Sequence, residues 1–151
     1  MKSIVQFLVL LFIASSALAQ TDEQAITETC NNYLEGFYEG NTEKLKLALK
    51  PRLYKFGYWK NKDSKEYEYS SQMTYDKAMA FAKNVLEKKK FPAADAPKEV
   101  KVLDIGNHIA AAKVTAWWGI DYMLLSKEDG KWMIEQVIWE GPLEKSHRKA
   151  H

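Results

Sequence analysis

Residues 109–139, IAAAKVTAWWGIDYMLLSKEDGKWMIEQVIW, contain alternating apolar and polar positions in three successive segments. Such alternation is typical of strands that bury one face. Gly119 permits a reversal after the first segment, and Asp129-Gly130 is a strong signal for a two-residue hairpin turn after the second. Because no helical pattern separates them, the segments are predicted to form sequential antiparallel strands. The predicted strands are Ile109–Trp118, Asp121–Lys127 and Lys131–Trp139.

Three helices are predicted ahead of these strands. In the first, apolar residues recur on one helical face, and Thr21 and Asp22 stand where capping residues belong. The second is expected to be capped by Thr42 and stopped by Pro51, which lacks the backbone donor that a continuing helix needs. The predicted helices span about residues 22–39, 42–49 and 74–88.

Further strands complete the prediction. Leu53–Trp59 and Glu66–Ser70 are aromatic, alternating segments on either side of a polar stretch, which indicates a hairpin. Glu99–Ile105 also alternates, and the turn at Gly106-Asn107 leads from it into the stretch quoted above. Helices followed by sequential antiparallel strands favour an α+β fold with the helices packed on one face of the sheet.

Four blocks of the chain carry a resemblance to a known family. Residues 41–45, Ile109–Val114, Asp121–Leu125 and Asp129–Ile134 resemble the putative lumazine-binding family of the nuclear transport factor two-like, or SnoaL-like, superfamily. The resemblance implies a cone-shaped, cystatin-like roll: three N-terminal helices on a curved, mostly antiparallel sheet, with a pocket at the wide end. It also implies frequent homodimers through the convex side of the sheet. Because the superfamily includes isomerases, cyclases, dehydratases, binding proteins and transport adaptors, the resemblance implies no single reaction.

Residues 1–19 have the pattern of a secretory signal peptide. Lys2 supplies the positive charge, residues 4–14 are apolar except for Gln6, and Ala17-Leu18-Ala19 has the small residues that signal peptidase requires. The apolar stretch is too short for a membrane-spanning helix, which needs about 20 residues. We therefore expect cleavage after Ala19, a secreted or periplasmic protein, and no membrane attachment afterwards. The expected domain covers residues 20–145, followed by a flexible tail at 146–151.

Charge and cysteine content argue against several classes of protein. The chain has 22 basic and 20 acidic residues, so removal of Lys2 with the signal peptide leaves 21 and 20, a net charge of +1. This balance argues against a nucleic-acid partner. Cys30 is the single cysteine, so no internal disulfide is possible and a packing role is expected. With His108 the only histidine outside the tail, a zinc site is not expected, and neither is a cofactor.

Aromatic residues supply the candidate ligand site. The chain has five tryptophans and eight tyrosines, and alternation along the strands would turn about half of those on the sheet into the cone. There they would offer an apolar wall with polar tips to a planar or apolar small molecule, and Asp121 would help to orient it. The leading hypothesis is therefore an exported binding domain without a catalytic constellation. The predicted pocket residues are Tyr33, Tyr58, Trp59, Trp117, Asp121 and Trp139.

Two alternatives stay open. A SnoaL-like isomerase or dehydratase would use a pocket carboxylate, from Asp121 or Glu135, together with Tyr33 as donor to a developing oxyanion. That alternative requires a buried carboxylate within hydrogen-bond reach of Tyr33. The second alternative is an interaction module whose open sheet face binds another envelope protein.

Overall fold

The structure is a computed structural model that describes residues 20–147. The predicted signal peptide and residues 148–151 of the predicted tail lie outside the described residues. In chain order, the elements are α1 (Asp22–Glu39), α2 (Thr42–Ala48), β1 (Leu49–Lys60), β2 (Tyr67–Met73), α3 (Tyr75–Glu87), β3 (Glu99–Ile105), β4 (Ile109–Ala116), β5 (Gly119–Glu128), β6 (Lys131–Gly141) and a 3₁₀ helix (Lys145–His147).

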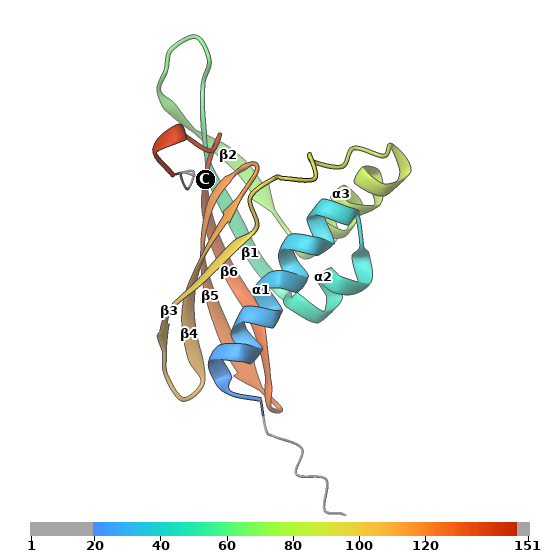
Figure 1. Cartoon of the computed structure of the whole chain (residues 1–151), viewed down its shortest axis with the longest axis vertical. Helices are drawn as coiled ribbons and strands as arrows, with labels where there is room; N and C mark the ends of the chain where they lie inside the picture. Colours follow the sequence, from blue (N-terminus) through green and yellow to red (C-terminus); the bar gives the residue numbers. More distant parts are fainter. Residues whose placement is uncertain (1–19, 148–151) are drawn as a thin grey trace, which may run out of the picture.

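The strands form one six-stranded sheet in the order β2-β1-β6-β5-β4-β3. Every neighbouring pair is antiparallel except β1 and β6, which run parallel. Figure 1 shows α1, α2 and α3 together on one side of the curved sheet. The predicted α+β fold, with three helices packed on a mostly antiparallel sheet, is confirmed.

The helices begin where their capping side chains can satisfy free backbone amides. Thr21 caps α1 in a reciprocal capping box with Gln24. The predicted Thr42 cap of α2 is wrong. Asn41 holds that position, because its side-chain oxygen accepts from the backbone amides of Glu43 and Lys44.

Two strand boundaries also differ from the prediction. β1 begins at Leu49 and contains Pro51, which ends no helix but lies where the pairing of β1 with β6 is interrupted. A proline can occupy such a position because no partner strand needs its missing amide hydrogen. At the other end of the sheet, β4 stops at Ala116, so Trp117 and Trp118 form the turn into β5 instead of continuing the strand.

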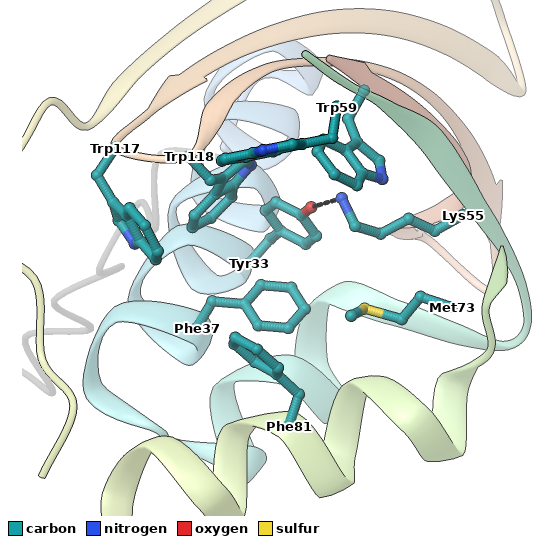
Figure 2. Close-up of a pocket in the computed structure, with 9 residues that line it drawn as sticks. Tyr33, Phe37, Lys55, Trp59, Met73, Phe81, Trp117 and Trp118 are labelled. Atoms are coloured by element: carbon teal, nitrogen blue, oxygen red, sulfur yellow. Dashed lines mark hydrogen bonds between the residues drawn. The ribbon is translucent and has the colours of Figure 1, made fainter. Parts of the chain in front are cut away.

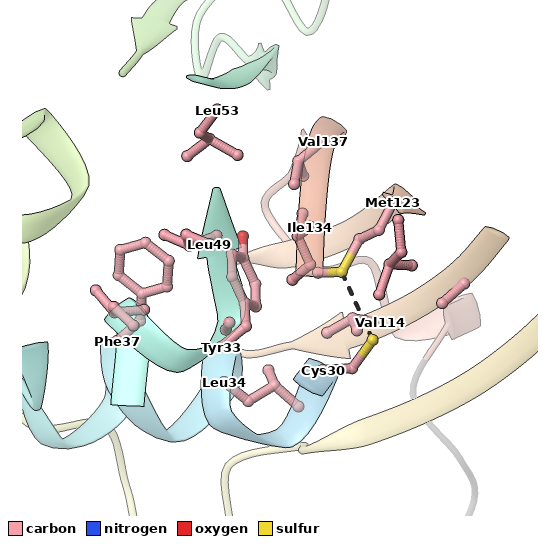
Figure 3. Close-up of a cluster of buried hydrophobic side chains, with 14 of the residues drawn as sticks. Cys30, Tyr33, Leu34, Phe37, Leu49, Leu53, Val114, Met123, Ile134 and Val137 are labelled. Carbon is pink, nitrogen blue, oxygen red and sulfur yellow. Dashed lines mark hydrogen bonds between the residues drawn. The ribbon is translucent and has the colours of Figure 1, made fainter. Parts of the chain in front are cut away.

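The core lies between the helices and the inner face of the sheet. Figure 3 shows Cys30 and Leu34 of α1 facing Met123 and Ile134 of the sheet, and all four are at most 1% exposed. The Cys30 sulfur lies 4.0 Å from the Met123 sulfur, and burial raises the pKa of the Cys30 thiol to about 12. Cys30 is therefore a neutral packing residue. No described helix is both long and apolar enough to cross a membrane.

Candidate ligand-binding site

A cavity of about 190 Å³ lies between α1, α3 and one end of the inner sheet face. Figure 2 shows its side chains converging from both layers of the fold, with Phe81 of α3 opposite Tyr33 and Lys55. The lining is aromatic except for one thioether and one amine. The lining residues are Tyr33, Phe37, Lys55, Trp59, Met73, Phe81, Trp117, Trp118 and Trp139.

Local structure explains why these side chains meet. Tyr33 and Phe37 are one turn apart on α1 and therefore share a helical face. Along β1, Lys55 and Trp59 point to the inner face because side chains alternate between the two faces of a strand. Trp139 enters from β6, which pairs with β1 at this level.

A hydrogen-bonded network of four side chains forms the polar floor of the cavity. The Lys55 amine donates to the Tyr33 hydroxyl at 2.8 Å, and that hydroxyl donates to Asp121 Oδ2 at 2.5 Å. The indole of Trp118 donates to the other oxygen, Asp121 Oδ1, at 3.0 Å. Lys55 Nζ also lies 3.5 Å from Asp121 Oδ2. Asp121 is completely buried, so these partners replace water around its carboxyl group.

Burial and charge set the protonation of this network. Burial lowers the pKa of Lys55, while Asp121 acts in the opposite direction. Burial and the nearby Asp121 hold the pKa of Tyr33 well above its usual value, so its hydroxyl stays protonated. The Lys55 amine also lies 5.4 Å from the centre of the Trp139 ring and 5.5 Å from that of Tyr33, within cation–π range.

The remaining walls are aromatic and reach the surface. Phe37 packs edge-on against both Phe81 and Trp118 at ring separations of 5.8 Å, and Trp59 lies 6.2 Å from Trp139. Trp59 and Trp117 are 40% and 48% exposed, so they stand at the mouth of the cavity. Large rings that are partly in water have apolar surface to bury against a ligand.

The structure brings four of the six predicted pocket residues to the cavity: Tyr33, Trp59, Trp117 and Trp139. Asp121 is the fifth, and it lies behind Tyr33 in the floor network rather than in the lining. The prediction that Tyr58 lines the pocket is wrong. It follows Gly57 on β1 and points to the outer face, where it packs against Tyr69 at 6.1 Å. Tyr58 and Trp59 are adjacent, so strand alternation allows only one of them into the cavity.

The two predicted acids have different positions. Asp121 accepts a hydrogen bond from Tyr33, as the enzyme alternative requires. Glu135 does not reach this site, because it lies on the outer face of the sheet. There Arg52 Nε donates to Glu135 at 2.7 Å, and the Arg52 hydrogen bonds lower the pKa of that carboxyl. Glu135 therefore cannot serve as the base in this cavity.

Sequence reasoning missed Lys55, the single charged residue of the lining, and also Phe37, Met73, Phe81 and Trp118. A signal for Lys55 was present: it shares the odd-numbered, otherwise apolar face of β1 with Leu53 and Trp59. A lysine in such a face is a candidate functional residue, since lysine is rarely buried without a partner. Within residues 20–147, no group of three or more histidine, cysteine or acidic side chains could hold a metal ion.

Three helices on a curved sheet, with an apolar cavity between them, are the features of an NTF2-like domain. Residues 21–140 match the sequence profile of the family described as putative lumazine-binding, and the chain belongs to that family. Both the expected family and the expected superfamily are confirmed.

Solved structures agree on the fold. An NTF2-like protein of unknown function from Shewanella baltica matches with a TM-score of 0.59 and 20% identity, over 80% of this chain and 95% of that one. A similar protein from Methylobacillus flagellatus matches with a TM-score of 0.56 and 25% identity, over 79% and 90%. A domain of unknown function with a cystatin-like fold from Nostoc punctiforme gives 0.54 and 12%, over 83% and 80%. Comparison with curated proteins gives no match.

Proposed function

We propose that this chain is an exported binding domain for a planar, uncharged ring compound that carries a carbonyl oxygen. The observation that supports the proposal is the Lys55 amine, which borders an otherwise aromatic and apolar cavity. An ammonium group has three hydrogen-bond donors. Tyr33 and Asp121 account for two of them, and the third is available to an acceptor on the ligand.

Charge balance favours an uncharged ligand. Asp121 already offsets the charge of Lys55, and both groups are buried. An anionic ligand would add an uncompensated charge to this site, and such charges are costly away from water. A carbonyl oxygen needs only one donor and would leave the pair intact.

The size of the cavity sets the size of the ligand's ring system. An apolar protein cavity of about 150 Å³ is known to hold benzene. At about 190 Å³, this cavity has room for one ring or two small fused rings, and further substituents would leave past Trp59 and Trp117. Lumazine, the compound in the family's name, is a fused two-ring system with two carbonyl groups, so it is the first ligand to test.

Binding without turnover is part of the proposal. None of the described residues that line the cavity is a carboxylate, and the Tyr33 hydroxyl donates to Asp121 instead of into the cavity. A general acid or base must reach the proton that it moves. In the resting network, the Tyr33 hydroxyl proton is directed to Asp121, and Asp121 lies behind Tyr33, outside the lining.

Replacing Lys55 by methionine tests the role of the amine. We expect lumazine to bind about 10- to 100-fold more weakly to Lys55→Met, because a hydrogen bond from a charged donor contributes about 1.5–3 kcal/mol. Titration followed by tryptophan fluorescence gives both dissociation constants. Lys101→Met, at an exposed position of β3, is the matched control and should bind as the unaltered protein does.

The same titration can contradict the proposal. Equal affinity of Lys55→Met and the unaltered protein would remove Lys55 from the binding site, and no binding by the unaltered protein would exclude lumazine. If Lys55→Met proves unstable, the double variant Lys55→Met/Asp121→Asn removes both charges together and can replace it.

Export is proposed from the sequence. Residues 4–14 and the small residues that end at Ala19 have the features of a cleaved leader. Cleavage after Ala19 would preserve the α1 cap, because the capping box uses Thr21 and Gln24 only.

A homodimer is also proposed, through an aromatic surface on the outer sheet face. The outer-face patch consists of Tyr54, Phe56, Tyr58, Tyr69, Tyr122, Leu124 and Ile138, and its largest exposed fractions are 60% for Tyr69 and 53% each for Tyr122 and Leu124. Phe56, Ile138 and Tyr122 are neighbours in register across three strands, so the patch is continuous. Arg52 and Glu135 place both signs of charge on the same face, as a two-fold interface can use.

The dimer is tested with Tyr122→Lys/Leu124→Lys. We expect this variant to be a monomer in analytical ultracentrifugation, because it puts two charges in the middle of the apolar contact. Leu47→Lys, at a residue of α2 that is 65% exposed, should leave the dimer unchanged. An unaltered protein that sediments as a monomer would contradict the homodimer. The alternative for the outer-face patch would then be binding to another envelope protein.

A further inference from the structure

We propose that Lys55 forms a covalent imine with small aromatic aldehydes that enter the cavity. This inference rests on the proposed binding function, since the aldehyde must first occupy the site. It adds a reaction to that function: the domain would capture reactive carbonyl compounds reversibly as well as bind unreactive ones.

The position of the Lys55 amine meets the first requirement for imine formation. The amine borders the cavity, while the side chain that carries it is only 7% exposed. A carbonyl group hydrogen-bonded to this amine would have its carbon next to the nitrogen that must attack it. Burial of the amine lowers its pKa, and desolvation of a lysine in an apolar pocket is a general way to make it nucleophilic.

The floor network meets the second requirement, a place for the protons. Lys55 Nζ is 2.8 Å from the Tyr33 hydroxyl, which is 2.5 Å from Asp121 Oδ2. A proton can therefore pass from the ammonium through Tyr33 to Asp121 without leaving the cavity floor. Asp121 lies 3.5 Å from the same nitrogen and would also be the counter-ion of the positively charged product.

The reaction balances without any further reagent. The ammonium gives one proton to Asp121, and the neutral amine attacks the carbonyl carbon, whose π electrons move to the oxygen. That oxygen takes a second proton from the attacking nitrogen, which gives a carbinolamine. The proton held by Asp121 returns through Tyr33 to the hydroxyl group, which leaves as water while the nitrogen lone pair forms the C=N bond. The ammonium and the aldehyde become a protonated imine and one water molecule.

The aromatic lining would stabilise the product. The rings of Trp139 and Tyr33 lie within 5.5 Å of the Lys55 nitrogen, so they face the charge of the protonated imine as they face that of the ammonium. The aryl group of the aldehyde would occupy the apolar space bounded by Phe37 and Phe81. Lys60, at the end of the same strand, has a side chain that is 35% exposed and lacks this enclosure.

The test is reductive trapping. The protein is incubated with benzaldehyde and sodium cyanoborohydride, which reduces the imine to a stable amine, and peptide mapping by mass spectrometry gives the labelling rate of each lysine. We expect Lys55 to be labelled at least about tenfold faster than the exposed Lys101 and Lys131, because the cavity would hold benzaldehyde next to the Lys55 amine and burial lowers the pKa of that amine. Its rate should saturate with benzaldehyde and fall when benzyl alcohol, which has no carbonyl group, competes for the cavity.

A variant and a binding measurement separate the possible outcomes. Tyr33→Phe removes the shorter of the two contacts of the Lys55 amine, 2.8 Å to Tyr33 against 3.5 Å to Asp121, and with it the proton path through Tyr33. It should therefore slow the labelling of Lys55 and leave that of Lys101 unchanged, with benzyl alcohol affinity as the check on the cavity. Labelling of Lys55 no faster than that of Lys101 overturns the imine proposal. If Lys55 is not labelled faster but benzyl alcohol still quenches tryptophan fluorescence, the proposed binding function is retained and only the proposed imine is rejected. If neither compound binds, the proposed function fails too.

Discussion

Asp121→Ala is expected to lower the free energy of unfolding by about 3–5 kcal/mol, because removing one member of a buried ion pair leaves the other charge without compensation. Lys55 would keep its burial and lose its counter-ion. The Tyr33 hydroxyl and the Trp118 indole would lose their common acceptor in the same step. Urea unfolding, followed by circular dichroism, measures the change as a lower transition midpoint with an unchanged slope.

A double variant is the control for this effect. In Asp121→Leu/Lys55→Met both charges are absent, and apolar replacement of a buried pair is often neutral or stabilising. We therefore expect the double variant to be clearly more stable than Asp121→Ala. An Asp121→Ala protein within about 1 kcal/mol of the unaltered one would show that the pair is not held away from water as the structure places it.

Gly119→Ala is expected to destabilise the protein by about 3 kcal/mol or more, from backbone strain and overpacking together. Gly119 has φ +153°, and a Cβ atom there would lie 1.8 Å from the carbonyl oxygen of Glu140. The backbone must move to relieve this contact, and the turn that moves contains Trp117 and Trp118. Because Trp118 also donates to Asp121, lumazine affinity should fall together with stability. Thermal unfolding and the fluorescence titration measure the two effects.

Gly130→Ala is the matched control. Gly130 also has positive φ, +76°, but no atom outside its two chain neighbours lies within 4 Å of the position that a Cβ would take. Gly130→Ala should lower the free energy of unfolding only by the strain of a left-handed alanine, about 1 kcal/mol, and should leave ligand affinity unchanged. Similar losses in Gly119→Ala and Gly130→Ala would mean that the contact with Glu140 is not the cause.

Local patterns predicted most of the fold. Thr21 caps α1 as expected, and β3 has the predicted limits Glu99–Ile105. These features depend on neighbouring residues, through capping hydrogen bonds and strand alternation. The predictions are wrong where a residue's conformation depends on an element that is distant in the sequence. Pro51 is part of a strand because β6 leaves it unpaired, and Trp117 leaves β4 because the chain reverses before Gly119.

The candidate site was less predictable, because its polar floor joins residues far apart in the sequence. Tyr33 was recognised from its helical face, but its bond to Asp121 spans 88 positions, and that to Lys55 spans 22. Tyr58 and Trp59 lie on opposite faces of β1, and both faces carry large apolar or aromatic side chains, so the local sequence favours neither as the inward one. The same holds for Glu135. The sequence predicts the strand that contains it, but does not show whether its side chain lies on the inner or the outer face of the sheet.

The parallel pairing of β1 with β6 has a consequence for folding. Gly57 pairs with Trp139, 139 − 57 = 82 positions later, so the chain must close a long loop before these strands meet. Loop closure of this kind slows folding, and contacts that depend on it form late. Lys55 and Trp139 lie on these two strands. The cavity would therefore be absent from a growing chain, and ligand binding would report on molecules whose last strand is already in place.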